Sequence, residues 1–146
     1  MSWTGWTDSC LAPIQSSSGE QLETCCAAWI CDMNGSPWAE SLKAGSQAEK
    51  DHPKFSPEEF QKMARILTGS ASPDEVSQGI DMNGVHYMTI RQIPNDFVIC
   101  KKGNSGMTIA KAKQCIVIGM YEPGTQPGNN TKHVLDIRDK LQEMGY

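Results

Sequence analysis

The sequence predicts a single α+β domain, residues 1–146, in which a central antiparallel sheet is flanked by helices. From residue 79 onward, short apolar segments alternate with short polar turns, a pattern typical of an antiparallel meander. Helical apolar spacing appears near both ends of the chain and once in the middle. We expect the N- and C-terminal helices, which each carry one apolar stripe, to lie on the same face of the sheet.

The first expected helix follows Ser2, whose side chain can cap it. Trp3, Trp6 and Cys10 share one stripe at positions i, i+3 and i+7, and Pro13 should end the helix. The segment 15–21 is expected to be a loop. Residues 25–40 then predict a hairpin around the Asn34-Gly35 turn.

Residues 41–53 are polar and weakly helical, and we interpret them as a surface excursion. The clearest helix follows: Ser56 is its N-cap, Pro57 stands at its first position, Glu59 completes a capping box and Gly69 is a fitting stop. Its apolar stripe consists of Phe60, Met63 and Leu67.

The second half of the chain predicts strands over residues 84–92, 96–102, 106–112 and 114–122. The last of these is almost wholly apolar, which favours a central position in the sheet. Residues 123–130 are expected to form a loop, and residues 131–146 a final helix. The apolar stripe of that helix consists of Val134, Ile137, Leu141 and Met144.

Composition excludes several classes of function. A net charge of −4 argues against a general nucleic-acid-binding protein. There is no apolar run of about 18 residues for a membrane span, and "MSWTGWTDSC" lacks the features of a secretory signal, so we expect a cytosolic protein. We expect the six cysteines to be reduced and mostly buried. Since there is no CxxC pair and the three histidines are scattered, we expect no zinc site, and no other cofactor is predicted.

The cysteines and histidines also raise the question of a catalytic role. A cysteine with His86 or His133 could in principle form a nucleophile pair. The cysteines mostly stand in apolar strand segments, which favours inert thiols. Hydrolase, nucleotide-loop and zinc-protease motifs are absent from the sequence, so we expect that the protein is not an enzyme.

Six segments, in this order and spacing, together resemble the profilin family across nearly the whole chain. They are "MSW", "DMNGSPWAES", "FSPEEF", "GVHYMTI", "CKKGNSGMTIAKAKQCIVIGMYE" and "TQPGNN" followed by a helix ending in "GY". The resemblance implies an adaptor that binds monomeric actin and poly-L-proline. Such a protein sequesters actin monomers and delivers them to proline-rich elongation factors such as formins. The alternative is a small α+β signalling or trafficking scaffold that does not bind actin.

The resemblance implies a poly-L-proline site formed by aromatic and neighbouring residues. Polyproline II helices dock between aromatic rings at little entropic cost. The expected site consists of Trp3, Trp6, Trp38, Lys140, Leu141 and Tyr146. From spacing alone, these rings could simply pack the terminal helices onto the sheet.

Three features depart from the family pattern. Trp6 replaces the usual tyrosine, Lys140 replaces a histidine or tyrosine, and the segment Leu42–Asp51 is longer than in plant profilins. An additional tryptophan, Trp29, matches no family role and is assigned to packing.

The resemblance also implies an actin-binding surface on the later strands, the following loop and the start of the last helix. The expected residues are Lys101, Lys102, Lys111, Lys113, Thr125, Gln126, Pro127, Gly128, Asn129, Asn130, Lys132 and Asp136. For any single lysine the simpler interpretation is a solvated rim. The same lysines are candidates for phosphoinositide headgroups, as the family resemblance suggests.

Overall fold

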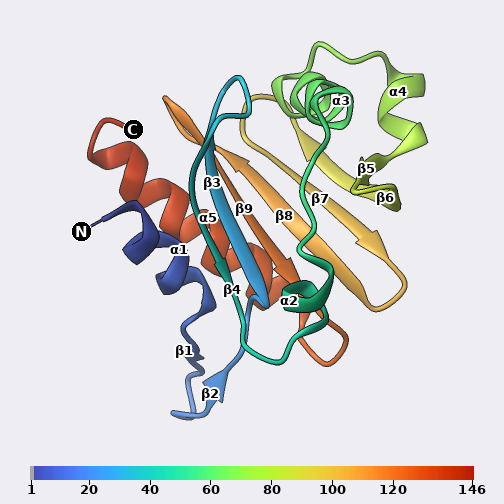
Figure 1. Cartoon of the computed structure of the whole chain (residues 1–146). Helices are drawn as coiled ribbons and strands as arrows, with labels where there is room; N and C mark the ends of the chain where they lie inside the picture. Colours follow the sequence, from blue (N-terminus) through green and yellow to red (C-terminus); the bar gives the residue numbers. More distant parts are fainter. Residues whose placement is uncertain (1) are drawn as a thin grey trace.

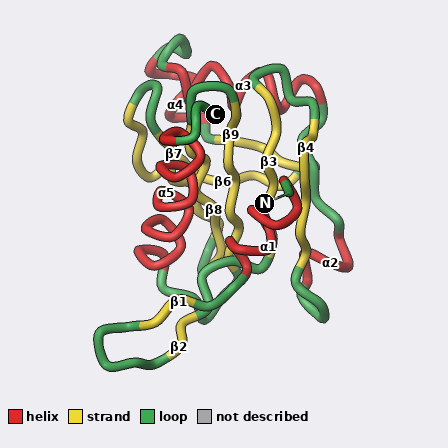
Figure 2. Tube along the Cα trace, turned by 90° about the vertical axis from the view of Figure 1, so that its left-hand side faces the viewer, coloured by secondary structure: helices red, strands yellow, loops and turns green. Residues whose placement is uncertain are grey.

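Seven antiparallel strands form one sheet in the order β4-β3-β9-β8-β7-β6-β5, in a computed structural model that describes residues 2–146. These strands are β3 (Ala27–Asp32), β4 (Pro37–Leu42), β5 (Ile80–Met82), β6 (Val85–Ile93), β7 (Phe97–Lys102), β8 (Ser105–Lys111) and β9 (Cys115–Tyr121). A separate small hairpin joins β1 (Ile14–Gln15) to β2 (Gln21–Leu22) and projects from the body of the molecule (Figure 2). The predicted α+β class is confirmed.

Helices cover both faces of this sheet. They are α1 (Trp3–Leu11), α2 (Gln47–Asp51), α3 (Pro57–Thr68), α4 (Pro73–Gln78) and α5 (Pro127–Glu143). The terminal helices α1 and α5 lie on one face, as predicted, and α3 covers part of the other (Figure 1). Within residues 2–146, none of the helices combines the length and the apolarity that crossing a membrane requires.

Two apolar cores follow from this layering. The core under α1 and α5 contains Cys10, Val117 and Val134, and the core under α3 contains Met63 and Met107. Alternate residues of β3 and β9 contribute to opposite cores, and so both strands are apolar along their length. The predicted central position of the last strand is confirmed, because β9 pairs with both β3 and β8.

The structure corrects several expected boundaries. The last helix begins at Pro127 rather than at residue 131. Proline is well suited to the first position of a helix, because the N–H group that it lacks would have no hydrogen-bond partner within the helix there. The same rule places Pro73 at the start of α4, which was not predicted. The expected excursion contains α2, and the β1–β2 hairpin flanks a turn in a segment that was expected to be a loop.

The turn between β5 and β6 also shows how local sequence fixes the packing of α3. Asn83 and Gly84 have φ angles of 54° and 75°, as a tight hairpin turn requires. Their backbone N–H groups donate to the carboxylate of Glu59 at 3.0 and 2.9 Å. The capping-box residue at the start of α3 therefore also holds this hairpin.

Candidate functional site

Three aromatic rings from distant parts of the sequence meet at one end of the molecule. Trp3 begins α1, Trp38 lies on β4 and Tyr146 follows α5. The centroid of the Trp3 ring is 4.6 Å from that of Trp38 and 4.9 Å from that of Tyr146. The two tryptophans are half-buried and Tyr146 is 38% exposed. We call Trp3, Trp38 and Tyr146 the aromatic cluster.

Backbone contacts position the segments that carry Trp3 and Tyr146. The side chain of Ser2 accepts a hydrogen bond from the backbone N–H of Gly5, which starts α1. The backbone N–H of Tyr146 donates to the carbonyl of Leu141 at 2.9 Å, and the carbonyl of Tyr146 accepts from the backbone N–H of Gln114. The backbone of the chain end that carries the Tyr146 ring is therefore held against the β8–β9 loop.

The other residues predicted for the proline site take different positions. Trp6 is half-buried against the core under α1 and α5. Leu141 is fully buried on the inner face of α5, so it supports the helix and offers no surface to a ligand. Lys140 is exposed and stands two turns after His133 on α5.

A polar network joins the two terminal helices further along, between the C-terminal end of α1 and the first turns of α5. The hydroxyl of Thr24 lies 2.7 Å from Nδ1 of His133 and 3.2 Å from the carbonyl of Cys10 at the end of α1. Burial lowers the pKa of His133, Lys140 lowers it further and Asp136 opposes the change. The neutral imidazole is thus the form that the fold favours.

The lysines predicted to bind actin form two separate pairs. Lys101 and Lys102 pair with Gly106 and Ser105 at the β7–β8 turn. Lys111 and Lys113 lie at the other end of β8, in and near the loop that contacts the chain end. The four lysines therefore do not form one patch, because consecutive antiparallel strands place their turns at opposite ends.

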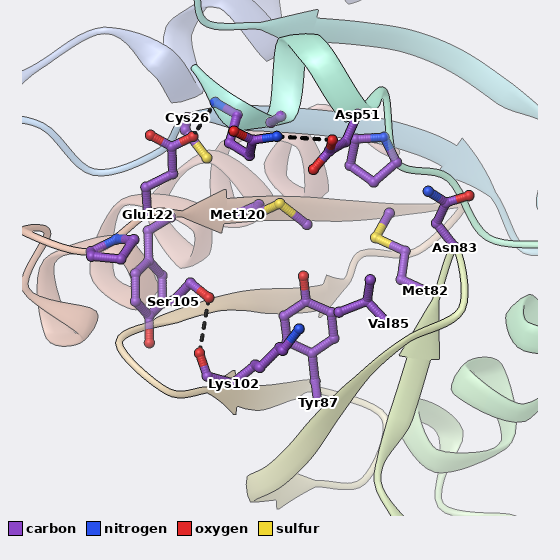
Figure 3. A pocket seen from close by; sticks show the side chains of 15 residues that line it. Cys26, Asp51, Met82, Asn83, Val85, Tyr87, Lys102, Ser105, Met120 and Glu122 are labelled. Carbon is purple, nitrogen blue, oxygen red and sulfur yellow. Dashed lines mark hydrogen bonds between the residues drawn. The ribbon is translucent and has the colours of Figure 1, made fainter.

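Lys101 and Lys102 also point to opposite faces of the sheet, because side chains alternate along β7. Lys101 follows Ile99 on the face of α1 and α5, and Lys102 follows Cys100 on the face of α3. There, Lys102 lines a cavity of about 260 Å³ under α2 (Figure 3).

The helix α2 forms the roof of this cavity. The backbone N–H of Gln47 donates to the Glu122 carboxylate at 2.7 Å, and the Gln47 side chain donates to Asp51 at 2.9 Å (Figure 3). Ala48 is buried in the core under α3. The excursion is thus a docked part of the fold.

Residues 125–136 divide between surface and interior. Lys132 and Asp136 are exposed on α5, but they form no ion pair with each other in the described chain. Asn130 is fully buried, and its side chain donates to the carbonyl of Thr24 and accepts from the hydroxyl of Thr108. The prediction that Asn130 contacts a partner is therefore wrong: the side chain is a structural element under the first turn of α5.

Sequence reasoning missed an apolar surface on β6. Met88 is 64% exposed and Ile90 57%. Met88 pairs with Lys101 and Arg91 pairs with Ile99, and the guanidinium of Arg91 lies 5.6 Å from the centre of the Phe97 ring, so Met88 and Arg91 lie on the face of α1 and α5. The exposed Ile90 stands beside Arg91 at a β-bulge. These helices pack mainly on β3, β4, β8 and β9, leaving this area uncovered. We call Met88, Ile90, Arg91, Ile99 and Lys101 the open sheet face.

A signal for this surface was present in the sequence. Residues 85–93 place apolar side chains on both sides of one strand. A β-bulge at Ile90, between Thr89 and Arg91, shifts the strand register. Because of this shift, simple alternation along the sequence does not show which side chains of β6 share a face of the sheet. The burial of each side could be assigned only once the helix positions were known.

All six cysteines are free and buried, which confirms the predicted burial. Burial raises the pKa of Cys26, Cys31 and Cys100 to about 12. A nucleophilic or metal-binding cysteine must be a thiolate, so these groups are poorly suited to either chemistry.

The profilin family model matches residues 1–146. The chain belongs to the profilin family. Profilins bind actin and poly-proline and form a non-enzymatic family. Profilin IB of Acanthamoeba castellanii is 27% identical, covers 99% of this chain and 100% of its own, and gives a TM-score of 0.74.

Two further solved profilins have the same fold. The profilin of Schizosaccharomyces pombe is 27% identical over 99% of this chain and 100% of its own, with a TM-score of 0.73. Mouse profilin IIa, solved in complex with a double repeat from the FH1 domain of mDia1, is 16% identical over the whole of both chains, with a TM-score of 0.69. At that identity the mouse protein supports the fold alone.

Proposed function

We propose that this profilin binds proline-rich segments of actin-assembly factors, such as formins, through the aromatic cluster, with Trp6 and Lys140 beside it. The observation that carries this proposal is the convergence of Trp3, Trp38 and Tyr146 with their rings still partly exposed. Trp3 and Trp38 are tilted to each other and Tyr146 stands edge-on to Trp3, so the rings offer apolar walls to a polyproline II helix. Indole N–H and phenol O–H groups suit the unpaired carbonyls of such a helix.

Monomeric actin is assigned to the open sheet face and the exposed start of α5. The exposed side chains of Met88 and Ile90 supply apolar contact, and Lys101 and Lys132 supply charge at its margin. Met88 and Lys101 lie near the β7–β8 turn, whereas Tyr146 contacts the loop at the other end of β8. The two partners can therefore bind together.

Simultaneous binding supports a specific cellular role. A profilin that holds an actin monomer and a proline-rich factor keeps the monomer from spontaneous nucleation and delivers it to the growing filament. We place this activity in the cytoplasm with the actin cytoskeleton. Phosphoinositide binding stays a prediction from the family resemblance, because the four lysines form two separate pairs.

A crossed pair of variants tests the assignment. Tyr146→Ala should weaken binding of a proline decamer about thirtyfold, as loss of an aromatic anchor typically does, and should leave actin binding intact. Ile90→Ser should weaken actin binding and leave decaproline binding intact. Tryptophan fluorescence measures the first and actin-monomer sedimentation the second. Failure of folded wild-type protein to bind either partner would favour the scaffold alternative.

A further inference from the structure

A cavity of about 350 Å³ lies across the sheet from both proposed surfaces. Its floor is the part of β3 and β9 that α3 leaves uncovered, and residues 52–57, which lead from α2 into α3, form one side. The walls are mostly apolar and include Trp29, Phe55, Phe60, Met82 and Ile118. We call this space the Trp29 cavity. Its volume falls in the range of small-molecule sites in proteins.

The carboxylate of Glu40 fixes one wall of the Trp29 cavity. It accepts a hydrogen bond from the indole N–H of Trp29 at 3.0 Å, and its oxygens lie 2.8 and 2.9 Å from Nε2 of His52. These contacts tie β4 to the residue that follows α2 and hold the indole ring in place. They also occupy the one carboxylate that lines the cavity in the described chain.

Lys54 gives the cavity a positive group without a counter-ion. It lines the cavity, it is exposed, and no ion-pair partner for it exists among residues 2–146. The carboxylate of Glu59, which borders the neighbouring hollow, accepts from the backbone N–H groups of Ser56, Asn83 and Gly84. The carboxylates of Glu40 and Glu59 thus both accept hydrogen bonds from other groups of the protein.

We propose that the Trp29 cavity binds a small aromatic carboxylate, with its ring against the aromatic walls and its carboxylate at Lys54. Charge complementarity selects this class, because a cationic ligand would meet Lys54 and would find Glu40 already paired. The site is separate from actin and proline binding. It gives a role to Trp29 and to the segment after the excursion, two features that neither proposed surface uses.

The indole N–H signals of the four tryptophans in a ¹⁵N–¹H NMR spectrum provide the test. The Trp29 signal is assigned from a Trp29→Phe variant, and the protein is titrated with 2-naphthoate and, separately, with the uncharged 2-naphthamide. We expect naphthoate to shift the Trp29 signal most, with a dissociation constant of roughly 1 mM or tighter, and naphthamide to bind more weakly. A proline decamer should shift the signals of the other tryptophans instead.

Matched lysine variants test the charge. Lys54→Gln should weaken naphthoate binding about two- to fivefold without changing naphthamide binding, and Lys50→Gln, an exposed lysine on α2 outside the cavity, should change neither. The proposal is overturned if naphthoate leaves the Trp29 signal in place, if it shifts the other tryptophans as strongly, if the amide binds equally well, or if Lys54→Gln has no effect.

Discussion

Replacement of Asn130 by alanine separates a structural role from a binding role at the start of α5. The amide of Asn130 donates to the carbonyl of Thr24 at 2.9 Å and to that of Gly119 at 3.3 Å, and its oxygen accepts from Thr108 at 2.8 Å. All of these bonds are inside the protein, where an unpaired polar group costs about 1–3 kcal/mol. Asn130→Ala should therefore destabilise the fold by about 2–4 kcal/mol.

Thermal unfolding followed by circular dichroism measures this effect, and the expected fall in melting temperature is about 5–15 °C. Asn129→Ala is the matched control, since its half-exposed side chain makes no hydrogen bond in the described structure and should change stability by less than about 0.5 kcal/mol. Actin affinity of folded Asn130→Ala should stay near that of the wild type. A melting temperature equal to that of the control, or a selective loss of actin binding at full stability, would refute the reasoning.

Four further outcomes are expected. Lys132→Glu should weaken actin binding by about ten- to hundredfold and spare decaproline binding, and unaltered actin affinity would show that the rim of α5 takes no part. Lys140→Tyr should strengthen decaproline binding by adding an aromatic wall, so equal or weaker binding in a fluorescence titration would count against a place for this residue in the site. Reductant should leave the melting temperature nearly unchanged because all six thiols are free and buried, and a large fall on adding it would reveal a structural disulfide. Folding lowers the pKa of His133, so the unfolded state binds more protons than the folded state below about pH 6.5. The wild type should therefore lose stability between about pH 7 and 5 more steeply than His133→Gln, and parallel stability profiles of the two proteins would contradict this explanation.

Local sequence was sufficient to predict most of the fold. Ser56 and Glu59 specified the start of α3 through a capping box that the structure contains, and the apolar run of β9 indicated a central strand. The short elements were harder to predict. The helix α2 has five residues and depends on contacts such as that between Gln47 and Glu122, which are 75 positions apart.

The two candidate surfaces differed in how well the sequence could predict them. The aromatic residues stood out because tryptophans are rarely left in water without a reason, and three of the predicted rings do meet. The open sheet face was harder to predict: the apolar residues of β6 are visible in the sequence, but the exposure of Met88 depends on where α5 lies on the sheet. Asn130 illustrates the converse: a polar residue beside a loop is expected outside, but the first turn of α5 directs it inward.

The affinity of this profilin for actin monomers, measured with and without a saturating proline decamer, tests the central claim most directly. Two separate surfaces on one domain predict that actin binds in both conditions, with dissociation constants that agree within about twofold. Loss of actin binding in the presence of the peptide would show that the two partners compete for one surface. Absence of actin binding in both conditions would contradict the proposed function itself.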